Sequence, residues 1–501
     1  FPWWHIQRVE YFRNDVRVVN TSLLQTDWYT AQMMRRTYKS DPLPVGFDHD
    51  QILMYSGGTD QVLVNSLSDL YYGNSVSTDV YKKIIDLRLK LNKTQAIQAI
   101  NNTASIHGRG LANLKATTAS MQGRVMALQS VVVRPVNEGD LTNDIHARFT
   151  ALKELVAGLQ NRTIEASQEA IQAIQGSFET LNSGWELIEL KEAMKFMYDD
   201  GNMANMSGSN VRFLPSGTLR MVVNKDNLIK SQVAKESERA IIRDYVDFTI
   251  KASALTREEL VMLDVIANAD LKRGVYFSNP YGAQVSRALY EAGAVKQTGS
   301  NYVVKPVESD VPYDVEEFYD VIMNLSHYGN MSDPKVLTDY YARRHTVQYR
   351  QQFLALAKYY AQTIDMATKA MSYPEEYIQS LKERGDLANY NRLKNFRDNN
   401  AKVISEAKTR AAALLNKSLQ VMPASIVLDG GEPQQVAIIE VEGGRYPRYG
   451  DGLLTDYVQV YYEIGAKEQA EKLGLELAGH YEQAIRFFLN APMKVVLNEG
   501  N

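Results

Sequence analysis

Apolar residues recur at helical spacing through the last third of the chain. Between Val347 and Ala370 they form one stripe, which predicts a single helix: Tyr349, Phe353, Leu356, Tyr360 and Ile364. Two further stretches keep the spacing of tetratricopeptide helices: Ala411, Leu415 and Ser418 before Pro423, then Tyr457, Tyr461, Gly465 and Ala470. The pattern predicts tetratricopeptide-like helical hairpins. Ordinary antiparallel helices without repeat ancestry are the alternative.

Helical periodicity also predicts two long helical stretches in the first half of the chain, Asp79 to Ser130 and Asn143 to Met197, with a breaker at 131–139. Their apolar positions form the two sides of a hairpin seam: Ile84, Leu87, Leu91, Ile97 and Ile100, then Ile145, Phe149, Leu152, Leu155 and Leu159. We interpret the pair as an antiparallel, coiled-coil-like insertion that projects from the body. An ordinary helical bundle is the alternative.

Strand-like patterns occupy two regions. Asp15 to Leu24 is a β-branched run that predicts a buried strand, followed by a helix that Thr26 or Asp27 can cap. Beyond residue 198, the pattern predicts strands within 211–223, 241–250, 274–278 (buried) and 302–307, and helices at 256–268, 283–292 and 315–325. The helix at 256–268 opens with a capping box.

These elements predict a predominantly helical α+β fold in four parts. An N-terminal α/β segment covers 1–78, and the long helical hairpin covers 79–197. A second α/β segment at 198–330 packs with the first. Tetratricopeptide-like repeats then cover 331–501, with insertions at 371–404 and 424–452.

Composition and motifs exclude several classes of function. A net charge of −4 over 501 residues argues against a nucleic-acid surface. The absence of cysteine excludes disulfides, thiolate metal sites and a cysteine nucleophile. The seven histidines show no metal-ligand spacing, and no phosphate loop or nucleophile motif is present. We therefore expect no catalytic, cofactor-binding or metal-binding residue, and we interpret the adjacent acids at 48–50 and 199–200 as solvated.

The hydropathy of the chain and its first residues lead to two separate expectations. No apolar run reaches the length of about 18 residues that a membrane helix needs, so we expect no transmembrane helix. The chain opens on Phe1-Pro-Trp-Trp-His5 without the features of a signal peptide. We interpret this start as a cut from a longer protein.

Seven residues are candidates for an interface: Trp3, Trp4, His5, Asp27, Trp28, Lys272 and Arg273. The aromatic start can form a belt at a membrane surface or pack in the core. The pair at 27–28 is either a helix cap with a packed indole or part of a surface that faces a cavity. The basic pair at 272–273 can hold an anionic group or form a surface ion pair.

Several motifs, in the same order, resemble those of one family. They are Arg13 to Tyr29, Ser40 to Pro44, Leu263-Asp264, Asn268, Lys272-Arg273, Val275 to Phe277, Tyr302 to Pro306, Met323-Asn324 and Tyr328 to Met331. The chain resembles the large, mostly Bacteroidetes membrane proteins that are related to transmembrane protein O-mannosyltransferases. The resemblance covers roughly 1–60, 186–370 and 405–490, so 61–185, 371–404 and 424–452 look like insertions.

This resemblance implies a protein with two halves that have different functions. The family has a glycosyltransferase-C membrane half, which acts on a lipid-linked sugar donor, and an extracytoplasmic half that ends in tetratricopeptide-like repeats. The chain is expected to be this second half, on the periplasmic face of a bacterial inner membrane and non-catalytic by itself. Its expected partners are its own membrane half and a protein or glycan acceptor.

Two alternatives come from other classes. The chain can be a free-standing periplasmic or outer-surface glycan-binding scaffold, similar to starch-utilisation lipoproteins that also carry tetratricopeptide helices. A soluble hydrolase is the third hypothesis, and no constellation of residues supports it.

Overall fold

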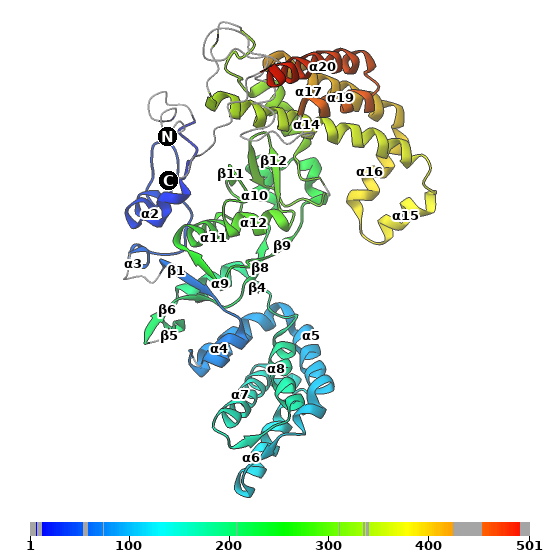
Figure 1. Ribbon diagram of the computed structural model, residues 1–501. Coiled ribbons are helices and arrows are strands. Elements are labelled where there is room, and N and C mark those ends of the chain that lie inside the picture. Colours follow the sequence, from blue (N-terminus) through cyan, green and yellow to red (C-terminus); the bar gives the residue numbers. More distant parts are fainter. Residues whose placement is uncertain are drawn as a thin grey trace. The chain divides into compact units, whose positions relative to one another are not determined.

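The computed structural model of the chain (Figure 1) describes residues 7, 13–53, 59–73, 75–206, 208–309, 311–333, 336, 340–423 and 453–490. The chain divides into two compact units, unit 1 (Phe1–Val295 and Val303–Val307) and unit 2 (Lys296–Tyr302 and Glu308–Asn501). The predicted predominantly helical α+β fold is confirmed, since helices dominate and each sheet has only two or three strands. The predicted boundaries near residues 78, 197 and 330 stay predictions.

Residues 13–53 of unit 1 form short helices: η1 (Thr21–Gln25), α2 (Asp27–Met33) and α3 (His49–Ile52). The predicted strand from Asp15 to Leu24 is therefore wrong. The Asn20 side chain accepts a hydrogen bond from the Leu23 amide, and the Asn20 amide donates to the Tyr29 hydroxyl at 3.0 Å. These bonds satisfy the backbone locally, so the end of this run forms the helical turn η1 and its β-branched residues before Asn20 do not form a strand.

Five helices of unit 1 form a bundle: α4 (Leu67–Gly73), α5 (Thr78–Leu111), α6 (Ala119–Val133), α7 (Leu141–Gln160) and α8 (Gln168–Asn182). Helices α5 to α8 lie side by side in Figure 1. The two predicted helical stretches are helical over most of their length, but breaks at 112–118, 161–167 and 183–189 divide them into shorter helices, so they do not form one hairpin of two long helices. Short strands β2 (Lys115–Ala116) and β3 (Ile164–Glu165) pair at the first two of these breaks. One shared core favours the helical-bundle alternative.

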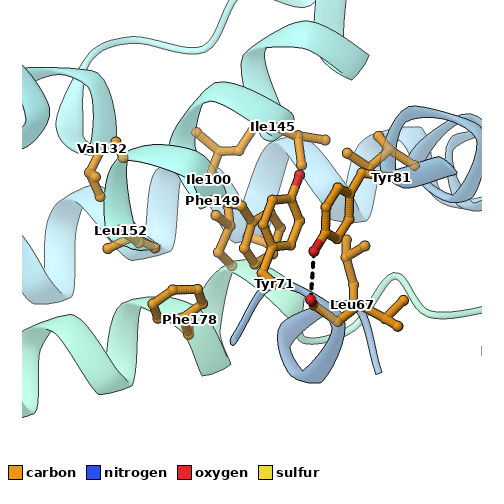
Figure 2. Close-up of a cluster of buried hydrophobic side chains, with 14 of the residues drawn as sticks. Leu67, Tyr71, Tyr81, Ile100, Val132, Ile145, Phe149, Leu152 and Phe178 are labelled. Carbon is orange, nitrogen blue, oxygen red and sulfur yellow. Dashed lines mark hydrogen bonds between the residues drawn. The ribbon is translucent and has the colours of Figure 1, made fainter. Parts of the chain in front are cut away.

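Stacked aromatic rings lie at the centre of this core (Figure 2). The Tyr71 ring lies between those of Tyr81 and Phe149, with ring centroids 4.0 and 4.6 Å away. The Tyr81 hydroxyl donates to the Leu70 carbonyl at 2.5 Å, and the Tyr71 hydroxyl lies 2.6 Å from Nδ1 of His146. Both polar tips therefore have partners, which removes most of the cost of burying them.

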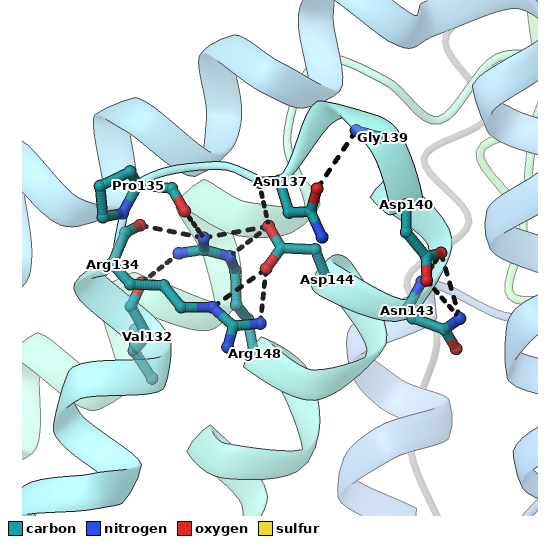
Figure 3. A network of polar contacts seen from close by, with 9 residues as sticks. All are labelled: Val132, Arg134, Pro135, Asn137, Gly139, Asp140, Asn143, Asp144 and Arg148. Atoms are coloured by element: carbon teal, nitrogen blue, oxygen red, sulfur yellow. Dashed lines mark hydrogen bonds and ion pairs between the residues drawn. The ribbon is translucent and has the colours of Figure 1, made fainter.

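A buried ion pair within α7 is connected to the end of α6 by hydrogen bonds (Figure 3). The side chains of Asp144 and Arg148 are both fully buried, with Arg148 Nη2 3.0 Å from Asp144 Oδ2. Arg148 also donates to the carbonyls of Val132, Arg134 and Pro135, and Arg134 donates to the second Asp144 oxygen at 2.7 Å. Carbonyl groups at the end of a helix have no donor within that helix. Here the Arg148 guanidinium supplies the hydrogen bonds that the carbonyls at and after the end of α6 would otherwise lack.

Three small sheets also belong to unit 1, with strand orders β10-β1-β7, β4-β8-β9 and β5-β6. Their strands are β1 (Gln61–Val64), β4 (Ile188–Glu189), β5 (Ala204–Met206), β6 (Ser209–Val211), β7 (Phe213–Leu214), β8 (Thr218–Val222), β9 (Tyr245–Thr249) and β10 (Ala254–Thr256). The strands predicted within 211–223 and 241–250 are confirmed. In β9, exposed and buried residues alternate, as one half-buried sheet face requires.

The remaining elements of unit 1 are mostly helices: α9 (Leu190–Tyr198), η3 (Asp200–Asn202), α10 (Lys225–Lys230), η4 (Glu236–Ile241), α11 (Arg257–Ala269) and α12 (Gln284–Glu291). The predicted capping box is confirmed, since the Glu259 carboxylate accepts from the amide and hydroxyl of Thr256 at 3.3 Å. Strand β11 (Tyr276–Phe277) lies where a buried strand is predicted, but Tyr276 is 51% exposed. The predicted burial is therefore wrong. The residues of β12 (Val295–Thr298) and β13 (Asn301–Val304) are divided between the units.

Unit 2 is helical over most of its described length: α13 (Val315–Asp320), the π-helical turn η5 (Val321–Leu325), α14 (Tyr340–Ala370), α15 (Glu375–Glu383), α16 (Leu387–Asp398), α17 (Asn400–Val421), α19 (Leu453–Glu463) and α20 (Lys467–Asn490). The predicted helix, turn and helix at 457–470 are confirmed, and Gly465 permits the turn with φ +82°. The predicted insertion at 371–404 contains the hairpin α15–α16, whereas the one at 424–452 lies outside the described residues. Tetratricopeptide ancestry stays a prediction.

Candidate functional site

The predicted interface residues lie in three places. Trp3, Trp4 and His5 are outside the described residues. Asp27 is the first residue of α2, and its carboxylate accepts from the Trp28 amide at 2.9 Å. Trp28 is 59% exposed, which does not favour the alternative of a packed indole. No hydrogen bond or ion pair within the described ranges joins this pair to the basic pair at 272–273.

The basic pair follows a left-handed turn at the end of α11. Asp270 and Leu271 have φ of 50° and 53°, which directs the next residues away from the helix. Lys272 is exposed, and Arg273 is half-buried. The Arg273 guanidinium donates to the carbonyls of Asp41 and Pro42 at 3.3 Å each. Among the described residues it has no carboxylate partner, so the predicted surface ion pair is not formed there.

A second arginine shares this loop, and the sequence reasoning missed it. Arg17 donates to the Arg35 carbonyl at 2.6 Å, to the Thr37 hydroxyl at 2.9 Å and to the Asp41 carbonyl at 3.3 Å. Burial, with a further contribution from Arg273, lowers the pKa of Arg17. The sequence places a cationic residue, Arg17, inside a run predicted to be a buried strand, and this mismatch could have marked it. Because the run was assigned to a sheet, Arg17 was not considered as a site residue.

The second candidate site is the buried carboxylate of Asp264 on α11. Its oxygens accept hydrogen bonds from the Gly46 amide at 2.6 Å and from the Asn268 side chain at 2.9 Å. A side chain at Gly46 would lie 3.2 Å from Asn268, so a glycine suits this close approach. Burial raises the pKa of Asp264 to about 7, although the amides of Gly46 and Phe47 oppose the shift. Asp264 thus fastens the loop at 46–47 to α11.

Replacing Asp264 with asparagine is expected to flatten the pH dependence of stability. The raised pKa means that the folded state binds this proton more tightly than the unfolded state. The contribution of Asp264 to the free energy of unfolding is therefore lost as pH rises from about 4 to 7. For the wild type we expect this group alone to cost roughly 2–3 kcal/mol between pH 5 and pH 8. Urea denaturation at both pH values measures the difference between the two proteins. An equal pH dependence in the variant would contradict the assignment.

Acids that resemble catalytic pairs in the sequence serve local structure. Asp48 accepts from the Gln51 amide at 3.0 Å and caps α3. Asp199 accepts from the Gly201 amide at 2.9 Å, and Asp200 pairs with Arg212. Within the described ranges, no cluster of three or more histidine or acidic side chains could hold a metal ion.

A polar groove lies between α5 and α8 of the bundle. It encloses about 460 Å³ and is lined by Gln95, Gln98, Ala99, Asn102, Glu179, Thr180, Ser183 and Gly184. Nε2 of His107 lies 2.9 Å from the Thr180 hydroxyl, and this contact orients one wall. The sequence predicts polar, glutamine-rich outer faces for these helices. It does not predict the groove, because the groove requires that α5 and α8 become neighbours.

The sequence matches the family described as TMEM260-associated domain 2 over residues 1–138 and 151–321. Comparisons with curated proteins and with solved structures find no match. The matched ranges include most of the bundle, so the expectation that 61–185 is an insertion outside the family is wrong. In the part of the chain that the structure describes, no helix combines the length and apolar character needed to cross a membrane. Since the match covers more than half of its residues, the chain belongs to the TMEM260-associated domain 2 family.

Proposed function

We propose that the chain is the extracytoplasmic domain of a membrane glycosyltransferase-like protein and that it positions a glycan-bearing acceptor. Membership of the TMEM260-associated domain 2 family supports the association with such a membrane protein. In this proposal the lipid-linked sugar donor binds to the membrane half, and this chain supplies no catalytic group. Tetratricopeptide-like helices of unit 2 would offer a further surface for a protein acceptor or partner.

The polar groove between α5 and α8 is the observation that carries the acceptor role. Gln98 and Asn102 lie one helical turn apart on α5, opposite Glu179 on α8 and Ser183, which follows the end of α8. Amide groups both donate and accept hydrogen bonds, and a carboxylate accepts them, so the lining matches the hydroxyl groups of a saccharide. A cavity of about 460 Å³ is in the range of small-ligand sites.

Removing two of these amides is expected to weaken saccharide binding. We expect the double substitution Gln98→Ala and Asn102→Ala to lower affinity about 10-fold or more, because each lost hydrogen bond contributes about 0.5–1.5 kcal/mol. An array of bacterial oligosaccharides identifies the ligand, and titration calorimetry then compares the variants. Gln160→Ala is the matched control, since Gln160 is exposed at the end of α7 and does not line the groove.

Two outcomes would contradict the proposal. One is that no saccharide binds to the wild-type chain. The other is that binding is unchanged in the double variant while the thermal stability of that variant equals the stability of the wild type.

A further inference from the structure

We propose that Arg17 and Arg273 form a binding site for a phosphate group. This site goes beyond the acceptor groove and does not depend on it, because it lies on the loop at 35–42 and not on the bundle. The occupant is a phosphate carried either by a phospholipid headgroup or by a phosphorylated small molecule.

The first argument is the geometry of the two guanidinium groups. Arg17 Nη2 and Arg273 Nη1 both donate to the Asp41 carbonyl oxygen, each at 3.3 Å. They also share Ser40: Arg17 binds its carbonyl and Arg273 its hydroxyl, both at 3.4 Å. Both cations therefore lie within one hydrogen-bond length of the same oxygen atom, and their donor nitrogens are at most two such lengths apart. Paired guanidinium groups held in this way match the bidentate geometry of a phosphate.

The second argument is that their charge is not neutralised within the described residues. Backbone carbonyls and hydroxyls hold both side chains, and no carboxylate lies within ion-pair distance of either guanidinium in those ranges. The two acids within residues 13–17 and 35–41 pair with other arginines: Asp15 binds Arg13 at 2.9 Å, and Asp41 lies 3.9 Å from Arg36. Two like charges at this separation repel, and a bound anion would relieve the repulsion.

The third argument is the charge of the surrounding surface. Residues 13–17, 35–41 and 272–273 carry seven cationic side chains and two carboxylates, although the whole chain has a net charge of −4. Arg35, Arg36, Lys39 and Lys272 are exposed around the arginine pair. A local excess of positive charge raises the concentration of anions at the surface and speeds their binding.

The backbone supports the same location. Arg13, Tyr38, Asp270 and Leu271 have φ between 48° and 54°, a left-handed conformation that is unfavourable for residues other than glycine. All four belong to or flank the segments that supply the cations. Strained residues gather at binding sites when the strain fixes side chains for a ligand.

Thermal denaturation of the chain with pyrophosphate tests the site. At constant ionic strength, pyrophosphate is expected to raise the melting temperature above the value in chloride, because a ligand that binds only the folded state stabilises it. Titration calorimetry is expected to show affinity reduced about 10-fold or more in Arg273→Gln and reduced less in Arg273→Lys. Arg239→Gln is the control, since Arg239 is exposed in unit 1 and pairs with Asp226 and Glu236.

A third variant distinguishes loss of the binding site from misfolding of the loop. Lys272 is exposed, and its side chain has no hydrogen bond or ion pair in the ranges that the structure describes, so Lys272→Gln lowers the local charge without removing such a bond. It is expected to weaken binding by a few-fold. The site is refuted if Lys272→Gln and Arg273→Gln bind as well as the wild type, or if Arg239→Gln weakens binding as much as Arg273→Gln does.

Vesicles of phosphatidylcholine, with or without phosphatidylglycerol, distinguish the two sources of phosphate. If the wild-type chain sediments with anionic vesicles but not with neutral ones, and Arg273→Gln sediments with neither, the occupant is a lipid headgroup. Binding of pyrophosphate without vesicle binding identifies a phosphorylated small molecule. If neither pyrophosphate nor anionic vesicles bind better than chloride or neutral vesicles, the proposal is wrong.

Discussion

Replacing Arg148 with methionine is expected to lower the free energy of unfolding of unit 1 by about 3–5 kcal/mol. The substitution keeps most of the apolar stem and removes the charge that faces Asp144. Burial opposes ionisation of Asp144, but hydrogen bonds from Arg134, the Asn137 amide and Arg148 outweigh it and lower its pKa. Without Arg148 the fully buried carboxylate keeps only the half-exposed Arg134 and the Asn137 amide as partners, and the carbonyls of Val132, Arg134 and Pro135 lose this donor. Urea denaturation followed by circular dichroism measures the loss.

A second arginine of the same bundle provides the matched control. Arg124 pairs with Glu154 at 2.8 Å, but the two side chains are 63% and 40% exposed. Arg124→Met is expected to change stability by less than about 1 kcal/mol, because solvent screens an exposed ion pair. Equal losses in the two variants would show that the buried network does not hold the α6–α7 turn.

Replacing Tyr71 with alanine is expected to cost about 3–5 kcal/mol, as for other buried aromatic residues. Tyr71 is 1% exposed, and its ring stacks on both Tyr81 and Phe149 (Figure 2). The substitution leaves a cavity where three helices meet, and rigid neighbouring rings cannot close it. Chemical denaturation again gives the magnitude.

Tyr71→Phe separates the ring from its hydroxyl. It removes only the contact with His146 at 2.6 Å, so a loss of about 0.5–1.5 kcal/mol is expected. If the alanine variant were no less stable than the phenylalanine variant, the stacked rings would not be the centre of this core.

Local chemistry explains which elements could be predicted. The helix at 256–268 needs only its own capping box and apolar face, and the turn at Gly465 needs only a glycine, so both follow from residues close together in the chain. Local hydrogen bonds also explain why the strand predicted from Asp15 to Leu24 is wrong. Its β-branched residues favour a strand, but the bonds of Asn20 to Leu23 and Tyr29 decide the local structure.

The candidate sites divide in the same way. The basic pair Lys272-Arg273 could be identified as a possible anion site, because two adjacent cations are visible in the sequence. Its partner Arg17 lies more than 250 positions earlier, and only the fold brings both side chains to the Asp41 carbonyl. The polar groove likewise needs α5 and α8 as neighbours.

The sequence by itself determined the predominantly helical α+β class and the capped helices of this chain, because short-range hydrogen bonds and apolar periodicity act within one element. The order of its motifs also indicated the family to which it belongs. The tertiary structure alone decided that the helical region is a bundle, that Arg148 and Asp144 meet in its interior, and that Arg17 joins Arg273. These contacts depend on packing between distant segments, and the spacing of residues along the chain does not encode which segments become neighbours.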